Sequence, residues 1–181
     1  MSNQNLVAPD YGPIGFMFGD PTGAPVSAFS QADLYNAITL LSTRFDVPIC
    51  MIQTTRTRRG HYHHDAPRLP DGTVPKLGTV AARDLAVVGR ITMPCKSWRG
   101  AHATLVHEFA HHLTHCTWID ACHRLGPDRR WRDYRFIVPK PHGKLFHRML
   151  TRVANAWYGD ARLYPWITEY KRIAAAGPAR V

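Results

Sequence analysis

The stretch Thr104-Leu-Val-His-Glu-Phe-Ala-His-His112 contains the pattern H-E-x-x-H at His107, Glu108 and His111. Four residues make a little over one helical turn, so both histidines project from the same face of a helix. From that face their imidazoles can reach a single tetrahedral zinc ion at about 2.0 to 2.1 Å. The stretch therefore predicts a helix that supplies two ligands to one zinc ion.

Glu108 is one of only two glutamates in the chain, and it directly follows the first histidine of the motif. At this position a carboxylate meets a metal-bound water rather than the metal, which is where a general base must lie. Zinc lowers the pKa of that water towards about 7, and the carboxylate takes its proton as hydroxide attacks a carbonyl. The pattern predicts a hydrolytic centre with Glu108 as its base.

A third ligand is needed, because a catalytic zinc normally takes three protein ligands and a water. His115 is excluded, since a straight helix places it about 12 Å from His107 by rise alone. The metzincin pattern is also excluded, because Thr114 and Thr117 stand where it requires glycine and histidine. The residues alone leave six candidates open: Asp120, His123, Asp133, His142, His147 and Glu169.

Apolar periodicity around the motif predicts the fold class. The expected elements are helices at 31–44, 98–116, 142–159 and 165–177, and strands at 49–52, 79–82 and 85–93. Ser30 and Asp33 form the capping pattern of the first helix, and Leu105, Phe109 and Leu113 give the motif helix a packing face. We expect one α+β domain over residues 30–177, preceded by an irregular lead-in at residues 1–29 that is rich in glycine and proline.

About thirty residues after H-E-x-x-H, the segment His142-Gly143-Lys144-Leu145-Phe146 has the pattern H-G-x-x-[F/W] at an expected helix start. This combination resembles the SprT-like zinc metallopeptidases. In size and layout it is more similar to a group of small metallohydrolases from actinobacteria and their phages. The resemblance covers about residues 85–157.

The resemblance implies a minimal zincin-like fold, with a small twisted sheet packed against helices that include the motif helix. It implies one catalytic Zn²⁺ held by His107, His111 and His142, with Glu108 as the base of a metallopeptidase that cleaves amide bonds in peptides or proteins. It also places the expected strand at 85–93 where such enzymes pair an edge strand with their substrate. The paired C-x-x-C motifs of a SprT-type zinc ribbon are missing from the sequence, so DNA targeting by that module is not implied.

The charge of the chain supports a second hypothesis of a different class. Lysine and arginine total 23 against 13 acidic residues, a net charge of +10, and nine of the basic residues fall within residues 124–152. Such a surface suits a polyanion, so the alternative is a basic nucleic-acid-associated protein whose zinc site is structural or vestigial. A solvated arginine-rich loop explains the same residues.

Other features are less specific. We expect the histidines and arginines of residues 56–64 to form an exposed polar hairpin rather than a second metal or phosphate patch, and Cys116 and Cys122 to pack in the core. The oxyanion of the reaction could be stabilised by Tyr134, Arg148 or Tyr158, and the spacing of these residues in the sequence selects none of them. The four cysteines form no C-x-x-C pair, and no apolar run approaches about 18 residues. These features predict a soluble cytoplasmic protein without membrane contact.

Overall fold

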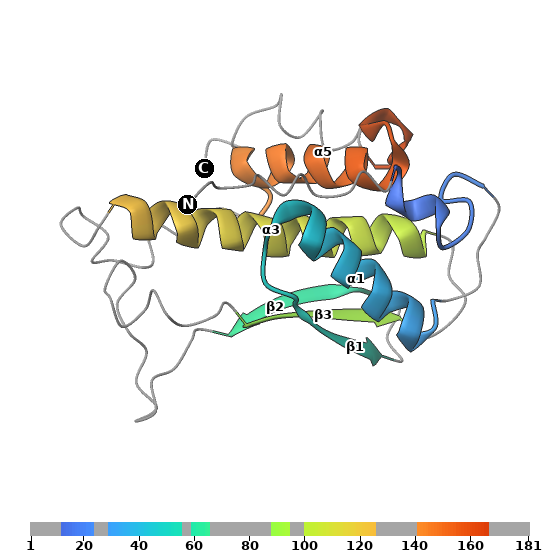
Figure 1. The fold of residues 1–181 in the computed structure, drawn as a ribbon, viewed down its shortest axis with the longest axis horizontal. Helices are drawn as coiled ribbons and strands as arrows, with labels where there is room; N and C mark the ends of the chain where they lie inside the picture. Colours follow the sequence, from blue (N-terminus) through green and yellow to red (C-terminus); the bar gives the residue numbers. More distant parts are fainter. Residues whose placement is uncertain are drawn as a thin grey trace, which may run out of the picture.

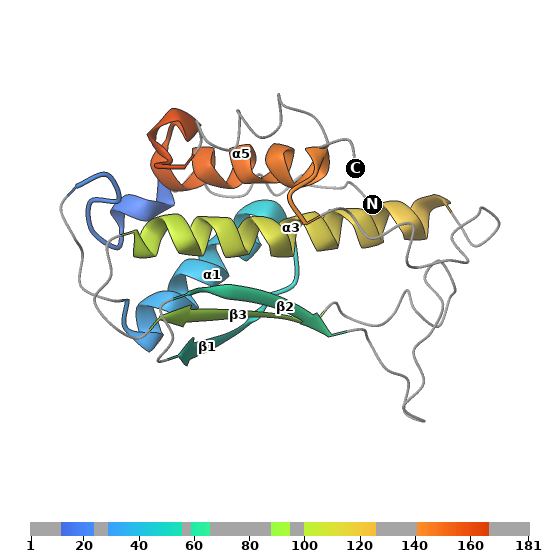
Figure 2. The same ribbon diagram turned by 180° about the vertical axis from the view of Figure 1, so that it is seen from behind.

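The computed structural model describes residues 12–23, 29–55, 59–65, 88–94, 100–125 and 141–166. This part of the chain is built in layers, with helix α3 (Ala101–Leu125) lying between a small sheet and helix α5 (Lys144–Tyr158) (Figures 1 and 2). Helix α1 (Gln31–Phe45) lies beside α3 on the same side of the sheet. The α+β class predicted from the sequence is confirmed.

The sheet has three described strands in the order β1-β3-β2. β1 (Met51–Thr55) runs parallel to β3 (Val88–Pro94), and β2 (His61–Asp65) runs antiparallel to it, with His61 opposite Thr92. β1 begins two residues later than the strand expected at 49–52. The strand expected at 79–82 lies outside the described residues.

Two expectations about the sheet were wrong. The strand expected at 85–93 is present as β3, but it is the central strand, so it cannot pair with a substrate as an edge strand. The segment expected to be an exposed polar hairpin contains β2, whose His61 and His63 side chains are exposed as expected. However, β2 pairs with β3 and not with β1, so β1 and β2 do not form a hairpin. The sequence His-Tyr-His-His-Asp hid this strand, because only Tyr62 provides the apolar half of the alternation.

Helix α1 begins as its sequence predicts. The Ser30 hydroxyl accepts a hydrogen bond from the Asp33 backbone N–H at 3.0 Å, and the Ser30 backbone N–H donates to the Asp33 carboxylate at 3.1 Å. This capping box satisfies two N–H groups that would otherwise lack partners at a helix start. Asp46 follows the last helical residue as the C-cap, in the left-handed conformation. The helix buries Leu34, Ala37, Ile38 and Leu41 in the core.

The described side chains of helix α3, up to residue 121, are mostly buried because the sheet and α1 cover one side of the helix and α5 covers the other. The expected packing residues Leu105, Phe109 and Leu113 are all buried. The helix continues to Leu125, nine residues past its expected end at residue 116. In the described part of the chain, no helix is both long and apolar enough to span a membrane.

Part of the expected lead-in belongs to the same core as the helices. A 3₁₀ turn, η1 (Ile14–Phe16), places Ile14 in the core with 1% of its surface exposed, next to α5. α5 ends at Gly159 as predicted, and Met149, Val153 and Trp157 form its buried face. A second 3₁₀ turn, η2 (Ala161–Leu163), follows α5 and leads to Trp166.

The buried His102 provides a test of the packing between α3 and α5. The Trp157 indole N–H donates to His102 Nδ1 at 3.1 Å, and burial lowers the pKa of His102 to about 4, although the charge of the nearby Asp20 opposes this shift. The unfolded chain therefore takes up a proton below about pH 6.5, whereas the folded chain does so only near pH 4. We expect stability to fall over this range, with His102 contributing up to about 3 kcal/mol.

Denaturant titrations of wild type and His102→Gln at pH 7.0 and 4.5 measure this contribution. Glutamine retains an acceptor for the Trp157 N–H but does not titrate. Wild type is expected to lose more stability on acidification than His102→Gln; an equal loss in both proteins would assign the acid sensitivity to other groups.

Candidate metal centre

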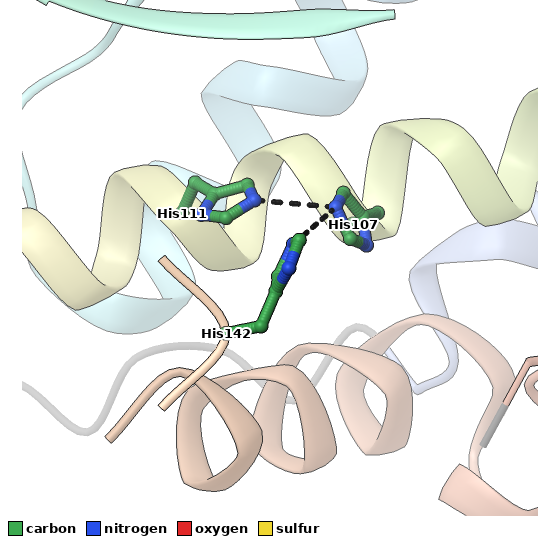
Figure 3. Close-up of side chains that lie close together, drawn as sticks. All are labelled: His107, His111 and His142. Atoms are coloured by element: carbon green, nitrogen blue, oxygen red, sulfur yellow. Dashed lines mark hydrogen bonds between the residues drawn. The ribbon is translucent and has the colours of Figure 1, made fainter. Parts of the chain in front are cut away.

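Three histidines from two segments converge at one side of α3 (Figure 3). His107 and His111 project from the same face of α3 one turn apart, as their spacing predicts. His142 lies in the turn that leads into α5, and the packing of α5 on α3 brings its ring to theirs. His142 is exposed while the other two are half-buried, so the cluster is accessible from the side of His142.

The spacing of the three rings matches a metal site. The Nε2 atom of His107 is 3.2 Å from His111 Nε2 and 3.4 Å from His142 Nε2, and one ring nitrogen of each residue lies within 4.8 Å of the others. Ligand atoms about 2.05 Å from a tetrahedral ion are separated by about 3.3 Å. The three histidines can therefore hold one metal ion, and the Nε2 atom of His107 already stands near the required separation from those of the other two.

The protonation of the histidines favours metal binding. Burial, with a smaller contribution from the charge of His142, lowers the pKa of His107 to about 4. Burial and the neighbouring histidines lower the pKa of His111 to about 3, and burial and His147 lower that of His142. Because a metal binds only the neutral imidazole, these groups are ready to act as ligands at neutral pH.

Glu108 lies on the side of α3 that faces β2, with 7% of its surface exposed. Its carboxylate accepts a hydrogen bond from the Tyr62 backbone N–H, and Gly60 lies against Glu108 and Thr104 just before β2. Burial raises the pKa of Glu108 to about 7, although the hydrogen bond opposes this shift. A carboxyl group with a pKa near neutrality suits both the acceptance and the release of a proton.

Phe146 supports all three histidines. Its ring is fully buried, and the distances from its centroid to the centroids of His107, His111 and His142 are 5.2, 4.3 and 4.9 Å. The aromatic residue of the H-G-x-x-[F/W] pattern thus forms an apolar support beneath the cluster. Trp166, after η2, also approaches His107, with a centroid distance of 6.3 Å.

The other candidate ligands do not join this cluster where the structure describes them. His115 lies against Tyr62 and Trp118, as its distance along the helix predicts, and Asp120 is exposed further along α3. His147 packs against Phe146 on α5. The side chain of His123, and Asp133 and Glu169 entirely, lie outside the described residues. Within the described ranges, no other histidine, cysteine or carboxylate groups with the three histidines.

The remaining sequence candidates have different outcomes. Tyr158 was a candidate residue for stabilising the oxyanion. It is buried at the far end of α5, and the helical rise places it about 21 Å from the start of that helix. Arg148 is exposed, and Tyr134 is outside the described residues. Cys116 packs with Trp118 and Ile119 as expected. Most of the basic segment, residues 126–140, is likewise not described.

Sequence reasoning missed two residues next to the centre, Tyr62 and His112. The Tyr62 ring lies parallel to that of His111, at an interplanar angle of 9° and a centroid distance of 6.3 Å. The imidazole of His112 is completely buried beside Tyr62. The period-two alternation around Tyr62 was the available signal, but the flanking histidines suggested a solvated hairpin instead.

The chain matches no protein-family model, no curated protein and no solved structure.

Proposed function

We propose that this protein is a zinc-dependent hydrolase, a metallopeptidase that cleaves amide bonds in peptide or protein substrates. The observation that carries the proposal is the convergence of His107, His111 and His142 at tetrahedral ligand spacing, with the buried Glu108 following the first of them. The resemblance to SprT-like zinc metallopeptidases supports the same assignment of roles.

Zinc is the metal we assign to the three histidines. Imidazole nitrogen is a common donor for Zn²⁺, and three protein ligands leave a fourth tetrahedral position for water, as in catalytic rather than structural sites. Bound there, zinc would supply a Lewis acid that polarises a carbonyl group and acidifies a water molecule. The exposed side of the cluster, at His142, gives a substrate access to this position.

Glu108 is the group that moves the proton. Its carboxylate accepts a proton from the attacking water and then delivers it to the amine that leaves the broken amide bond. The Tyr62 N–H remains bonded to the carboxylate and restricts its orientation. A pKa of about 7, raised by burial, allows both transfers near neutral pH.

The test begins with the zinc content of protein purified without a histidine tag, measured by elemental analysis. Hydrolysis is then assayed on casein and on a library of fluorogenic peptides, with a chelator and with zinc restored. We expect one zinc per chain, loss of hydrolysis with the chelator and recovery with zinc. A protein that takes up no zinc, or that binds zinc and cleaves no substrate, would overturn the proposal.

A further inference from the structure

We propose that His112 and Tyr62 are positioning residues that hold strand β2 against α3, the helix of the H-E-x-x-H motif, and thereby fix the carboxylate of Glu108. The inference rests on the proposed function. It concerns His112, which directly follows His111 and does not group with the three histidines of the candidate metal centre.

Hydrogen bonds settle the protonation of His112. Its Nε2 lies 2.8 Å from the carbonyl oxygen of Pro48, which can only accept, so Nε2 carries the proton and donates it. A neutral imidazole with a proton on Nε2 has an unprotonated Nδ1. This Nδ1 lies 3.3 Å from the Tyr62 hydroxyl, which therefore donates to it. His112 thus connects α3 both to the segment before β1 and to β2.

Tyr62 carries this connection to the metal centre in two ways. Its backbone N–H donates to the Glu108 carboxylate, and its ring lies parallel to the ring of His111. One residue on β2 therefore contacts both the general base and a metal ligand. The bond from its hydroxyl to His112 and the pairing of β2 with β3 together hold the backbone N–H of Tyr62 in place.

Two glycines leave the space that this arrangement needs. A Cβ atom at Gly89, on central strand β3, would lie 2.6 Å from His112 Nδ1 and 2.9 Å from the Tyr62 hydroxyl. A Cβ atom at Gly60 would collide with the Thr104 side chain and would lie 3.4 Å from Glu108 Cγ. Any larger residue at these positions would push β2 or Tyr62 away from α3. Gly89 therefore allows a close approach of the His112 and Tyr62 side chains to β3.

The test uses Tyr62→Phe, which removes only the hydroxyl, and Tyr35→Phe as a matched control at an exposed tyrosine of α1. Hydrogen exchange of the residue 62 amide is measured by NMR on the zinc-loaded protein. Loss of one hydrogen bond predicts about 5-fold faster exchange in Tyr62→Phe and no change in Tyr35→Phe. Zinc content is expected to remain one per chain in both variants.

Kinetics on the best cleaved peptide separate positioning from substrate contact. We expect kcat of Tyr62→Phe to fall about 10-fold with KM unchanged. The kcat of His112→Ala, which lacks both hydrogen bonds, is expected to fall further. Circular dichroism checks that this variant is folded. Unchanged exchange and kcat in Tyr62→Phe would overturn the inference, and so would a rise in KM alone.

The two proposals fail separately. If wild type cleaves no peptide, the hydrolase assignment fails, and the exchange rate of the residue 62 amide alone decides whether His112 and Tyr62 hold β2. If wild type cleaves peptides but Tyr62→Phe behaves as Tyr35→Phe does, the hydrolase assignment stands and the positioning role is wrong.

Discussion

Replacing Glu108 by glutamine is expected to lower kcat by about 10² to 10⁴-fold while one zinc per chain remains bound. That range is the usual contribution of a general acid or base. Glutamine has nearly the same shape as glutamate, and its carbonyl oxygen can still accept the hydrogen bond from the Tyr62 N–H. It cannot accept the proton of a water molecule. The substitution therefore removes the chemistry of the carboxylate and preserves its packing.

Asp120→Asn is the matched control for this experiment. Asp120 is an exposed carboxylate further along the same helix, and it is not part of the histidine cluster. Like Glu108→Gln, the Asp120→Asn variant replaces a carboxylate by an amide, so its kcat shows the effect of losing a charge alone. Zinc content by elemental analysis and kcat on a cleaved peptide are compared across the three proteins. Full activity in Glu108→Gln would contradict the role of this residue as base.

The side-chain chemistry of the metal centre could be predicted from the sequence because it depends on local geometry. The spacing of His107 and His111 fixes their common face once the segment is helical, and apolar residues at Leu105 and Phe109 make it helical. His142 was harder, since its approach to α3 depends on how α5 packs. The resemblance pointed to His142, and the structure places its ring in the cluster.

The sheet was harder to predict because strand order is a property of tertiary structure. A run of apolar residues at 85–93 indicates a strand but does not show whether it lies at the edge or the centre. β3 is central because β2 pairs on its other side, and β2 has only Tyr62 as an inward apolar side chain among its described ones. No spacing rule relates Tyr62 to Glu108, which is 46 residues later in the chain.

The length of α3 shows a related limit. A helix that packs on one side has an apolar stripe with a clear period, but α3 lies between two layers and is apolar on several sides. Its periodicity is therefore weak, and the end of the helix could not be located from the pattern. Trp118 and Ile119 continue the buried surface after Cys116, in contact with Leu145 of α5.

Removing the ring of His142 is expected to weaken zinc binding about 100-fold or more. Structural sites with four ligands bind zinc with a free energy of about 10 to 16 kcal/mol. One ligand of such a set therefore accounts for roughly 3 kcal/mol, which is about a 100-fold change in Kd. His142 is exposed in the turn before α5, so His142→Ala leaves the core intact and the metal-free protein should remain folded. Competition with a chromogenic chelator measures the affinity, with His61→Ala as the control at an exposed histidine of β2.

Thermal unfolding gives a second measurement of the same ligand. Zinc that joins His142 to His107 and His111 ties the start of α5 to α3, and a ligand that binds only the folded state stabilises it by about 4 kcal/mol at 1,000 times its Kd. Zinc is therefore expected to raise the Tm of wild type and of His61→Ala strongly, and that of His142→Ala much less. If His142→Ala keeps wild-type affinity and the full rise in Tm, His142 is not a ligand, and the third position belongs to another residue such as Glu169, which the resemblance did not select.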